Sequence, residues 1–293
     1  MKRLASSFAV LLFVSCASSR QSLDQRIASI EKSVPGATIA IAFYDLDSGK
    51  TWLHNEHVSM HAASTMKVPV MLALFDAIDR GTLDLDQQVP VRNEFTSIFD
   101  GSKFVVDAKE DSDQELYTKV GQTVTLRELI RRMITRSSNL ATDIVIELVG
   151  APRVMELMRG IGANEIQILR GVEDIAAYEH GMNNTTTAYD LMLVLRTIAE
   201  KKAISPAASE AMLEILRGQE FNSGIPAGLP SGTVVAHKTG NITAISHDAA
   251  IVYPAGGGPY VLVVMTRNIP KNRDASKIIA AVSRAVWERR GQF

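Results

Sequence analysis

Apolar positions along the chain follow two different spacings, and each spacing predicts a different kind of element. In residues 23–33 the apolar side chains lie three or four positions apart, which is the spacing of one helical face. Residues 38–44 are mostly β-branched or aromatic, and a turn-forming Asp-Ser-Gly-Lys stretch separates them from a second such run at 51–54. The chain is therefore expected to begin with an amphipathic helix followed by a β-hairpin.

Helical spacing dominates the middle of the chain. Residues 64–79 are apolar around most of the circumference of a helix, which predicts that this helix is buried. Five more helices are expected, over residues 126–135, 139–149, 153–159, 187–201 and 206–216. Between residues 93 and 121 the periodicity is lost and polar and charged side chains dominate, so this stretch is expected to be a long surface excursion.

Extended structure returns near the C-terminus. A stretch rich in glycine and proline at 224–232 is followed by three expected strands, at residues 233–239, 244–253 and 260–267, and by a closing helix at 275–289. Strands from both chain ends with helices between them predict an α+β fold, in which one antiparallel five-stranded sheet has flanking helices and an inserted all-helical lobe. Residues 20–293 would then form one domain, with an α/β lobe (20–63 and 224–293), a helical lobe (64–223) and a cleft between the two.

The first 19 residues differ in character from the rest. A basic start, a short apolar run and a series of small residues are typical of a secretory signal, and the run is too short to span a membrane as a helix. The protein is therefore expected to be exported to the periplasm. Cys16 is the only cysteine, so the mature chain can have no internal disulfide. Cys16 is either a site for a lipid anchor or part of the discarded leader.

Charge and histidine content limit the possible partners. Lys and Arg number 31 against 32 Asp and Glu, with no long run of one sign, so no nucleic-acid partner is expected. The six histidines show neither an HxH nor an HExxH spacing, so neither a metal site nor a cofactor is expected. A monomer that acts on a small-molecule substrate is the expectation.

Three short motifs carry the candidate chemistry. Ser64-Thr65-Met66-Lys67 begins the buried helix, Ser137-Ser138-Asn139 begins a later helix, and Lys238-Thr239-Gly240 lies in a strand. A serine hydroxyl is a weak nucleophile until a base takes its proton, and Lys67 lies one helical turn from Ser64. Burial and a nearby Lys238 would both disfavour a charge on Lys67. Taken alone, the first motif could equally be a helix cap with a lysine that reaches solvent.

The other two motifs favour the catalytic interpretation. Ser137 could be a simple helix cap, but in a cleft its hydroxyl can carry a proton between Lys67 and a leaving nitrogen. The amide of Asn139 can bond both Lys67 and a substrate. Lys238 offers a cation for a substrate carboxylate.

The residues around Lys238 complete the expected substrate contacts. Thr239 adds a hydroxyl donor, and Gly240 would allow a substrate backbone to lie against the strand. The main-chain N–H groups of Ser64 and Asn241 are the expected oxyanion donors.

On these motifs, and on Asn184-Thr185-Thr186-Thr187 before a helix, nearly the whole mature chain resembles the class A serine β-lactamases and the related penicillin-binding D,D-peptidases. The resemblance implies the fold described above and a glutamate on an omega loop that activates the deacylating water. Glu173 is the candidate for that glutamate, and its alternative is an ordinary surface-loop carboxylate.

The loop departs from the family pattern. It is shorter than usual, and Asp143 stands where an asparagine commonly steadies the glutamate. Two carboxyls so close would raise the pKa of one of them. Asn184 replaces the aspartate that normally pairs with Arg170, so Arg170 is expected to find another partner. His247, after the third motif, is either a further carboxylate contact or a packed strand histidine.

Three functions follow from these residues. A serine β-lactamase would form an acyl-enzyme on Ser64 and hydrolyse it with water activated by Glu173. A D,D-peptidase of peptidoglycan stems would need Ser64, Lys67 and Ser137 but no dedicated glutamate. A β-lactam-binding protein would become acylated without turnover.

Overall fold

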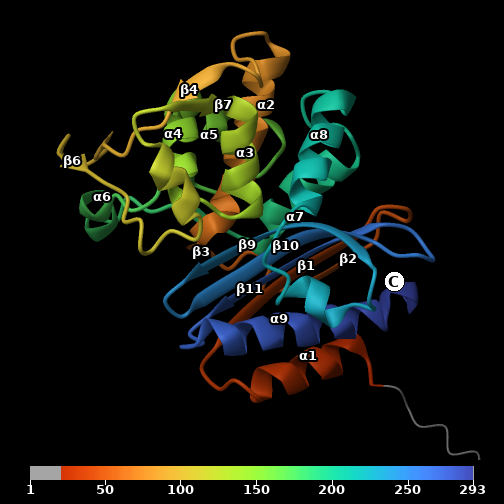
Figure 1. The fold of residues 1–293 in the computed structure, drawn as a ribbon. Helices are drawn as coiled ribbons and strands as arrows, with labels where there is room; N and C mark the ends of the chain where they lie inside the picture. Colours follow the sequence, from red (N-terminus) through yellow and green to blue (C-terminus); the bar gives the residue numbers. More distant parts are fainter. Residues whose placement is uncertain (1–20, 293) are drawn as a thin grey trace, which may run out of the picture.

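Strands from both ends of the chain form the central sheet (Figure 1). The computed structural model describes residues 21–292, so the expected signal segment and Cys16 lie outside the described residues. The sheet order is β2-β1-β11-β10-β9, with β1 (Thr38–Asp45), β2 (Thr51–His54), β9 (Val234–Ile242), β10 (Ile245–Tyr253) and β11 (Tyr260–Arg267). All neighbours are antiparallel, which confirms the expected five-stranded sheet.

Helices cover both faces of this sheet (Figure 1). Helices α1 (Leu23–Lys32) and α9 (Asn272–Trp287) pack on one face, and α7 (Ala188–Ala199) and α8 (Pro206–Arg217) lie on the other side, next to the helical lobe. Strand β1 shows how one sequence serves two cores. Ile41 and Phe43 pack toward α1 and α9, whereas the alternate residues Ala40 and Ala42 pack toward the helical lobe.

The helical lobe is built around a buried helix. It contains α2 (Lys67–Asp79), α3 (Leu126–Thr135), α4 (Asn139–Val149) and α5 (Ala151–Gly160). The helix expected over residues 64–79 is divided, because a 3₁₀ turn, η1 (Ala63–Met66), precedes α2. Pro69 lies in the first turn of α2, where a missing N–H breaks no intrahelical bond. The motif serine and lysine therefore belong to different elements.

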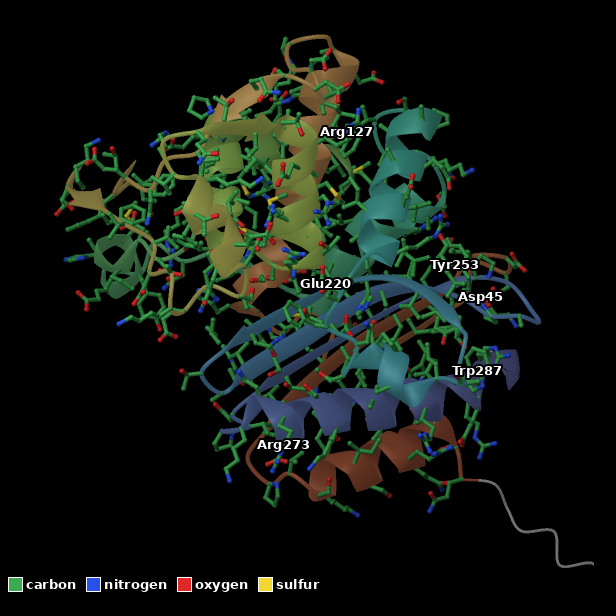
Figure 2. All side chains as sticks on the ribbon, viewed as in Figure 1. Asp45, Arg127, Glu220, Tyr253, Arg273 and Trp287 are labelled. Carbon is green, nitrogen blue, oxygen red and sulfur yellow. The ribbon has the colours of Figure 1, made fainter. Side chains whose placement is uncertain are left out.

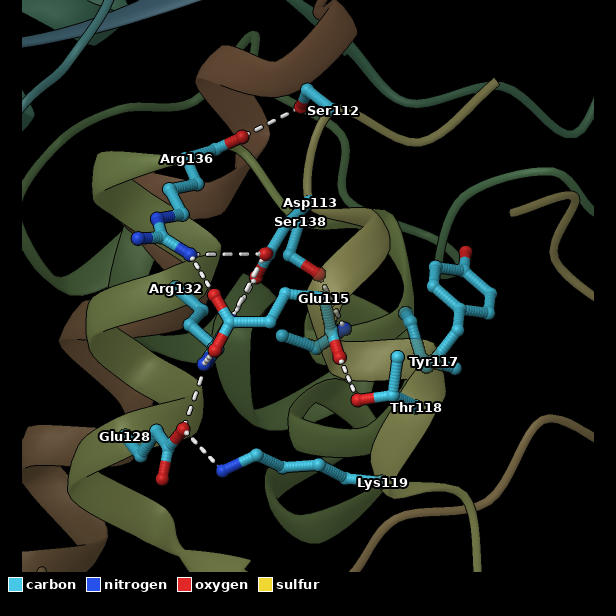
Figure 3. A network of polar contacts seen from close by, with 12 residues as sticks. Ser112, Asp113, Glu115, Tyr117, Thr118, Lys119, Glu128, Arg132, Arg136 and Ser138 are labelled. Atoms are coloured by element: carbon cyan, nitrogen blue, oxygen red, sulfur yellow. Dashed lines mark hydrogen bonds and ion pairs between the residues drawn. The ribbon is translucent and has the colours of Figure 1, made fainter. Parts of the chain in front are cut away.

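The polar stretch at 93–121 is more ordered than its sequence pattern predicts. It contains β5 (Phe95–Thr96), β6 (Lys103–Phe104) and the 3₁₀ turn η2 (Gln114–Lys119), and the paired strands β4 (Gln88–Pro90) and β7 (Thr123–Thr125) flank it. Figure 3 shows how its second half is held against α3. The guanidinium of Arg132 donates to both oxygens of Asp113, at 2.9 and 3.0 Å, and to Glu115 and Glu128. Both Arg132 and Asp113 are buried.

Short elements complete the fold. They are β3 (Met60–His61), which pairs with β8 (Thr185–Thr186), the five-residue helix α6 (Ile175–Glu179), and the 3₁₀ turns η3 (Ile225–Gly228) and η4 (Arg290–Gln292). The sequence pattern did not predict α6. Figure 2 shows side chains filling the spaces between these elements, with Arg273 and Trp287 near the two ends of α9. Within residues 21–292, no helix has both the length and the apolar character needed to cross a membrane.

Candidate active site

Ser64 lies in the 3₁₀ turn between β3 and α2, on the wall of a cleft. The cleft has a volume of about 300 Å³, and Asn139, Glu173 and Asn241 line it with Ser64. The residue before Ser64 is strained, because Ala63 has a φ of +45°. Strand β9 packs closely against this turn. A Cβ added to Gly240 would lie 3.0 Å from the backbone nitrogens of both Ser64 and Thr65. Gly240 thus allows β9 to pack closely on η1, a role that the sequence did not suggest.

Lys67 is fully buried behind this turn. Its Nζ donates to Ser137 O at 2.6 Å and to Asn139 Oδ1 at 2.9 Å, and it lies 3.3 Å from Ser137 Oγ. Burial lowers the pKa of Lys67 to about 8, and the nearby carboxylates, that of Asp111 first, limit the shift. Among the described residues, no hydrogen bond joins the Ser64 hydroxyl to Lys67. Lys67 therefore loses its proton more readily than an exposed lysine. Its hydrogen-bond partners in the structure belong to the Ser-Ser-Asn motif.

Ser137 lies between two buried amines. Lys238 Nζ donates to Ser137 Oγ at 3.0 Å and to Thr239 O at 2.9 Å. Burial, and next the charge of Lys67, hold the pKa of Lys238 well below its usual range. Ser137 itself has a φ of +59° and is not the cap of α4. The adjacent Ser138 caps α4 instead, through a bond from Ala141 N.

Asn139 connects Lys67 to Glu173. Its Oδ1 accepts from Lys67 Nζ at 2.9 Å, and its Nδ2 donates to Glu173 Oε1 at 2.8 Å. The other carboxylate oxygen of Glu173 accepts from the backbone N–H of Asp107 at 2.8 Å. Glu173 is half-buried and has a φ of +59°. The structure therefore brings the loop glutamate into the same cleft as Ser64 and into a chain of bonds with the amine.

Asp143 supports the loop from behind. Its Oδ1 accepts from Val172 N at 2.6 Å, and its buried Oδ2 has no hydrogen-bond partner among the described residues. Burial raises the pKa of Asp143 well above its usual value, and the charge of Glu173 adds to the rise. The sequence predicted a raised pKa for one of the two neighbouring carboxyls, and Asp143 has such a raised pKa. Gly171 is required beside it, because a Cβ there would lie 2.2 Å from Asp143 Oδ1.

Arg170 bonds to neutral groups. Its guanidinium donates to Met182 O at 2.9 Å, to Gly171 O at 3.1 Å and to Asn183 Oδ1 at 3.2 Å. Asn184, which stands in place of the expected aspartate, bonds the backbone of Leu169 and Arg170. Burial lowers the pKa of Arg170. The base of the loop is therefore closed by amide groups.

Asp111 is a site residue that the sequence did not reveal. Its buried carboxylate accepts from the backbone N–H groups of Asn139 and Leu140, both at 2.9 Å, and from the hydroxyl of Tyr117 at 2.9 Å. An acceptor at the start of a helix satisfies N–H groups that have no partner within the helix. Asp111 lies 28 residues before Asn139 within an aperiodic stretch, so no local spacing identifies it.

The remaining residues of the third motif lie along the edge strand β9. Thr239 and Asn241 line a second cavity, of about 420 Å³, together with Arg273 and Lys277 of α9. His247 is a packed strand histidine, because its Nε2 lies 2.9 Å from His61 O and burial lowers its pKa to about 4. Within residues 21–292, no three His, Cys, Asp or Glu side chains are grouped so that they could hold a metal ion.

Comparisons with known proteins agree with this geometry. A family model described as "Beta-lactamase enzyme family" matches residues 22–289. A β-lactamase of Bacteroides uniformis is 27% identical over 281 residues, covering 91% of this chain and 90% of the relative. The extended-spectrum β-lactamase PER-1 of Pseudomonas aeruginosa is 25% identical, covering 97% and 93%. The solved structure of PBP-A superimposes with a TM-score of 0.77 at 27% identity, covering 93% and 98%, and a mutant of PBP-A was solved as an acyl-enzyme complex with penicillin-G.

Proposed function

Because this chain belongs to the beta-lactamase enzyme family, we propose that it hydrolyses the amide of β-lactams through an acyl-enzyme on Ser64. The observation that carries the proposal is the position of Asn139. Its amide bonds a buried amine of lowered pKa on one side and the carboxylate of Glu173 on the other. One group is suited to forming an ester on Ser64, and the other to removing it.

Acylation begins when neutral Lys67 takes the proton of the Ser64 hydroxyl. The Ser64 Oγ–carbon bond forms, and the carbonyl electron pair moves onto oxygen, where the N–H groups of Ser64 and Asn241 donate to it. When the carbonyl re-forms, the lactam C–N bond breaks. The leaving nitrogen takes a proton from Ser137 Oγ, and the Lys67 ammonium restores that proton across the 3.3 Å contact.

Deacylation uses the other end of the same chain of bonds. Glu173 takes a proton from water, and the oxygen of that water attacks the ester carbonyl. The ester C–O bond then breaks, and the proton that Glu173 removed from the water passes to Ser64 Oγ, which restores the carboxylate of Glu173. The Asn139 amide holds Glu173 Oε1 in the cleft during this step.

A carboxylate on the substrate is expected to lie near Lys238 and Thr239. The Lys238 amine contacts Ser137 from the strand side, and a carboxylate bound beside it would favour its charged form. The Thr239 hydroxyl adds a donor at the same edge. Gly240 keeps β9 close to the Ser64 turn, so that the strand and the nucleophile face the same acyl group. These contacts suit a β-lactam that carries a carboxylate beside its ring nitrogen.

The test is stopped-flow kinetics combined with mass spectrometry, using a chromogenic cephalosporin. The unmodified enzyme should turn over, Ser64→Ala should form no adduct, and Glu173→Gln should accumulate a persistent acyl adduct. A persistent adduct on the unmodified enzyme would instead support a β-lactam-acylated binding protein. Turnover of a D-Ala-D-Ala peptide without turnover of the cephalosporin would support a D,D-peptidase. Rapid clearance of the adduct by Glu173→Gln would remove Glu173 from its role.

Export to the periplasm is part of this proposal, because the basic and apolar pattern of residues 1–19 is that of a secretory signal. A monomer in the periplasm, soluble or anchored by a lipid on Cys16, would meet β-lactams before they reach the cell wall and so confer resistance. The test is fractionation of cells that express either the unmodified protein or the Cys16→Ala variant. Retention of the unprocessed chain in the cytoplasm would contradict the proposal.

A further inference from the structure

The loop that carries Glu173 has an outer attachment in addition to its contacts with α4. Asp174, the residue after Glu173, is 2% exposed. Its Oδ1 accepts from Ser97 Oγ at 2.8 Å, and its Oδ2 accepts from the backbone N–H of Ile98 at 3.0 Å. Both donors belong to the polar excursion, 76 and 77 residues earlier in the chain. The same Oδ1 caps the short helix α6 through Ala177 N at 3.0 Å.

The polar excursion forms a hairpin, closed by side-chain hydrogen bonds, where it meets the loop that carries Glu173. Residues 93–107, here called the hairpin clamp, contain the paired strands β5 and β6. The Asn93 side chain closes their ends, with its Oδ1 accepting from Val106 N at 2.8 Å and its Nδ2 donating to Val106 O at 3.0 Å. This closure presents the next N–H, that of Asp107, to Glu173 Oε2 at 2.8 Å. At the other end, the ring of Phe99 stacks on His180 with 3.6 Å between centroids.

Glu173 needs support of this kind because its own backbone is unfavourable. A φ of +59° is unfavourable at a residue other than glycine and persists only where surrounding contacts impose it. On the side of α4, Asp143 supplies one bond to Val172 N, and within residues 21–292 the Arg170 guanidinium bonds neutral oxygens. The contacts that flank Glu173 on its C-terminal side are those of Asp174.

We propose that Asp174, held by Ser97 and Ile98 of the hairpin clamp, is a positioning residue that keeps Glu173 aimed at the acyl-enzyme. The inference rests on the proposed function, since it assigns Asp174 a part in the deacylation step. Asp174 touches neither Ser64 nor Lys67 in the hydrogen bonds of the described residues, so its loss should spare acylation. Through Ser97 and Ile98, a segment remote from the Ser64 motif thereby supports the hydrolytic step.

Two variants separate this role from simple stabilisation. Ser97→Ala removes the hydroxyl donor. Asp174→Ser keeps an oxygen that can cap α6 but is too short to reach the clamp. Both should leave the first-order acylation rate within about threefold and slow the clearance of the adduct by about tenfold or more, because small displacements of a catalytic group have large effects on rate. Ser97→Thr, which keeps the hydroxyl, should restore clearance.

The control is Ser102→Ala, in the same segment. Ser102 is exposed and its hydroxyl donates to Asp100 Oδ1 at 2.7 Å, and no hydrogen bond of the described residues joins that hydroxyl to the loop. This variant should acylate and deacylate at the unmodified rates. Stopped-flow kinetics measures both steps, and thermal unfolding shows that each variant is folded.

The outcomes distinguish the two proposals. If Glu173→Gln traps the adduct while Ser97→Ala and Asp174→Ser clear it at the unmodified rate, the clamp has no positioning role and the proposed function stands. Equal losses in acylation and deacylation would likewise overturn the positioning role. If Glu173→Gln itself clears the adduct at the unmodified rate, the role of Glu173 fails first.

Discussion

At the scale of single residues, the site combines buried amines with strained backbone. Lys67 and Lys238 are both fully buried, and both contact the hydroxyl of Ser137. Ser137 and Glu173 both have positive φ, and so does Ala63, which adjoins Ser64. Unfavourable conformations that gather around one cleft are typical of functional sites, because the surrounding structure must hold them in place. Burial lowers the pKa of both amines, and the charge of Lys67 lowers that of Lys238 further.

The lowered pKa of Lys67 predicts how acylation depends on pH. With a pKa of about 8, roughly a tenth of Lys67 is neutral at pH 7, so the acylation rate constant at saturating substrate should rise as pH increases through 8. Stopped-flow measurements between pH 6 and pH 9.5 would show this rise, with Lys67→Arg slow at every pH. A profile that is flat or falls between pH 7 and pH 9 would contradict the assignment.

The same pKa has a consequence for stability. The unfolded chain binds its Lys67 proton up to about pH 10.5, whereas the folded chain releases it near pH 8. Between these values the unfolded state holds more protons, so this group makes the free energy of unfolding rise with pH across that window. Its effect on stability is constant below the folded-state pKa.

At the scale of elements, buried charges fix the segments that lead into the site. Asp111 bonds the first N–H groups of α4, and Arg132 of α3 holds Asp113 two residues later (Figure 3). Glu115, which is more exposed, bonds both Arg132 and Arg136, and these bonds lower its pKa to about 2. The chain from 111 to 115 is thereby attached to two helices of the lobe. An aperiodic polar sequence can form such structure, because its order comes from paired charges instead of an apolar face.

Arg132→Ala is predicted to destabilise the protein strongly. The change leaves the buried carboxylate of Asp113 without its main partner, and breaking a buried pair in this way typically costs about 3–5 kcal/mol. Chemical denaturation measures the loss. The matched control is Arg127→Ala on the same helix, whose ion pair with Asp86 is exposed, so that the change should stay within about 0.5 kcal/mol. Similar losses in the two variants would refute this account.

At the scale of the whole molecule, the cleft exists because the edge strand of the sheet meets the first turn of the helical lobe. Strand β9 carries Lys238 and Asn241, and η1 carries Ser64. The apolar core is continuous across this boundary, since residues of α2, α4 and α7 pack together with the inner residues of β1, β10 and β11. The two lobes therefore hold the motifs at a fixed separation.

Gly240→Ala tests this junction. The new Cβ would lie 3.0 Å from the nitrogens of Ser64 and Thr65, which forces β9 and η1 apart and should slow acylation by about tenfold or more. Gly256→Ala, in the turn between β10 and β11, is the control, because no atom lies within 4 Å of its added Cβ. Burst kinetics measures acylation in both variants. Unchanged acylation in Gly240→Ala would show that the close contact is not needed for reactivity.

Local periodicity predicted the longer helices and strands, with bounds within three residues of those observed. Strand β11 and helices α3 and α4 begin and end at the predicted residues, because apolar spacing within one segment depends only on that segment's own solvent exposure. The division of η1 from α2 and the short helix α6 escaped prediction. Each depends on how the chain is held at its ends by distant groups, as Asp174 shows through its bonds to Ser97 and Ile98.

The sequence by itself determined the fold class and the residue types of the candidate site, because the three motifs carry their chemistry in short, recognisable spacings. Tertiary structure alone decided which atoms meet. It placed Ser137 between two amines, made Asn139 the link from Lys67 to Glu173, and brought the Asp107 N–H to the loop glutamate. These contacts join segments up to about a hundred residues apart, and only the closure of the whole chain around its core sets such distances.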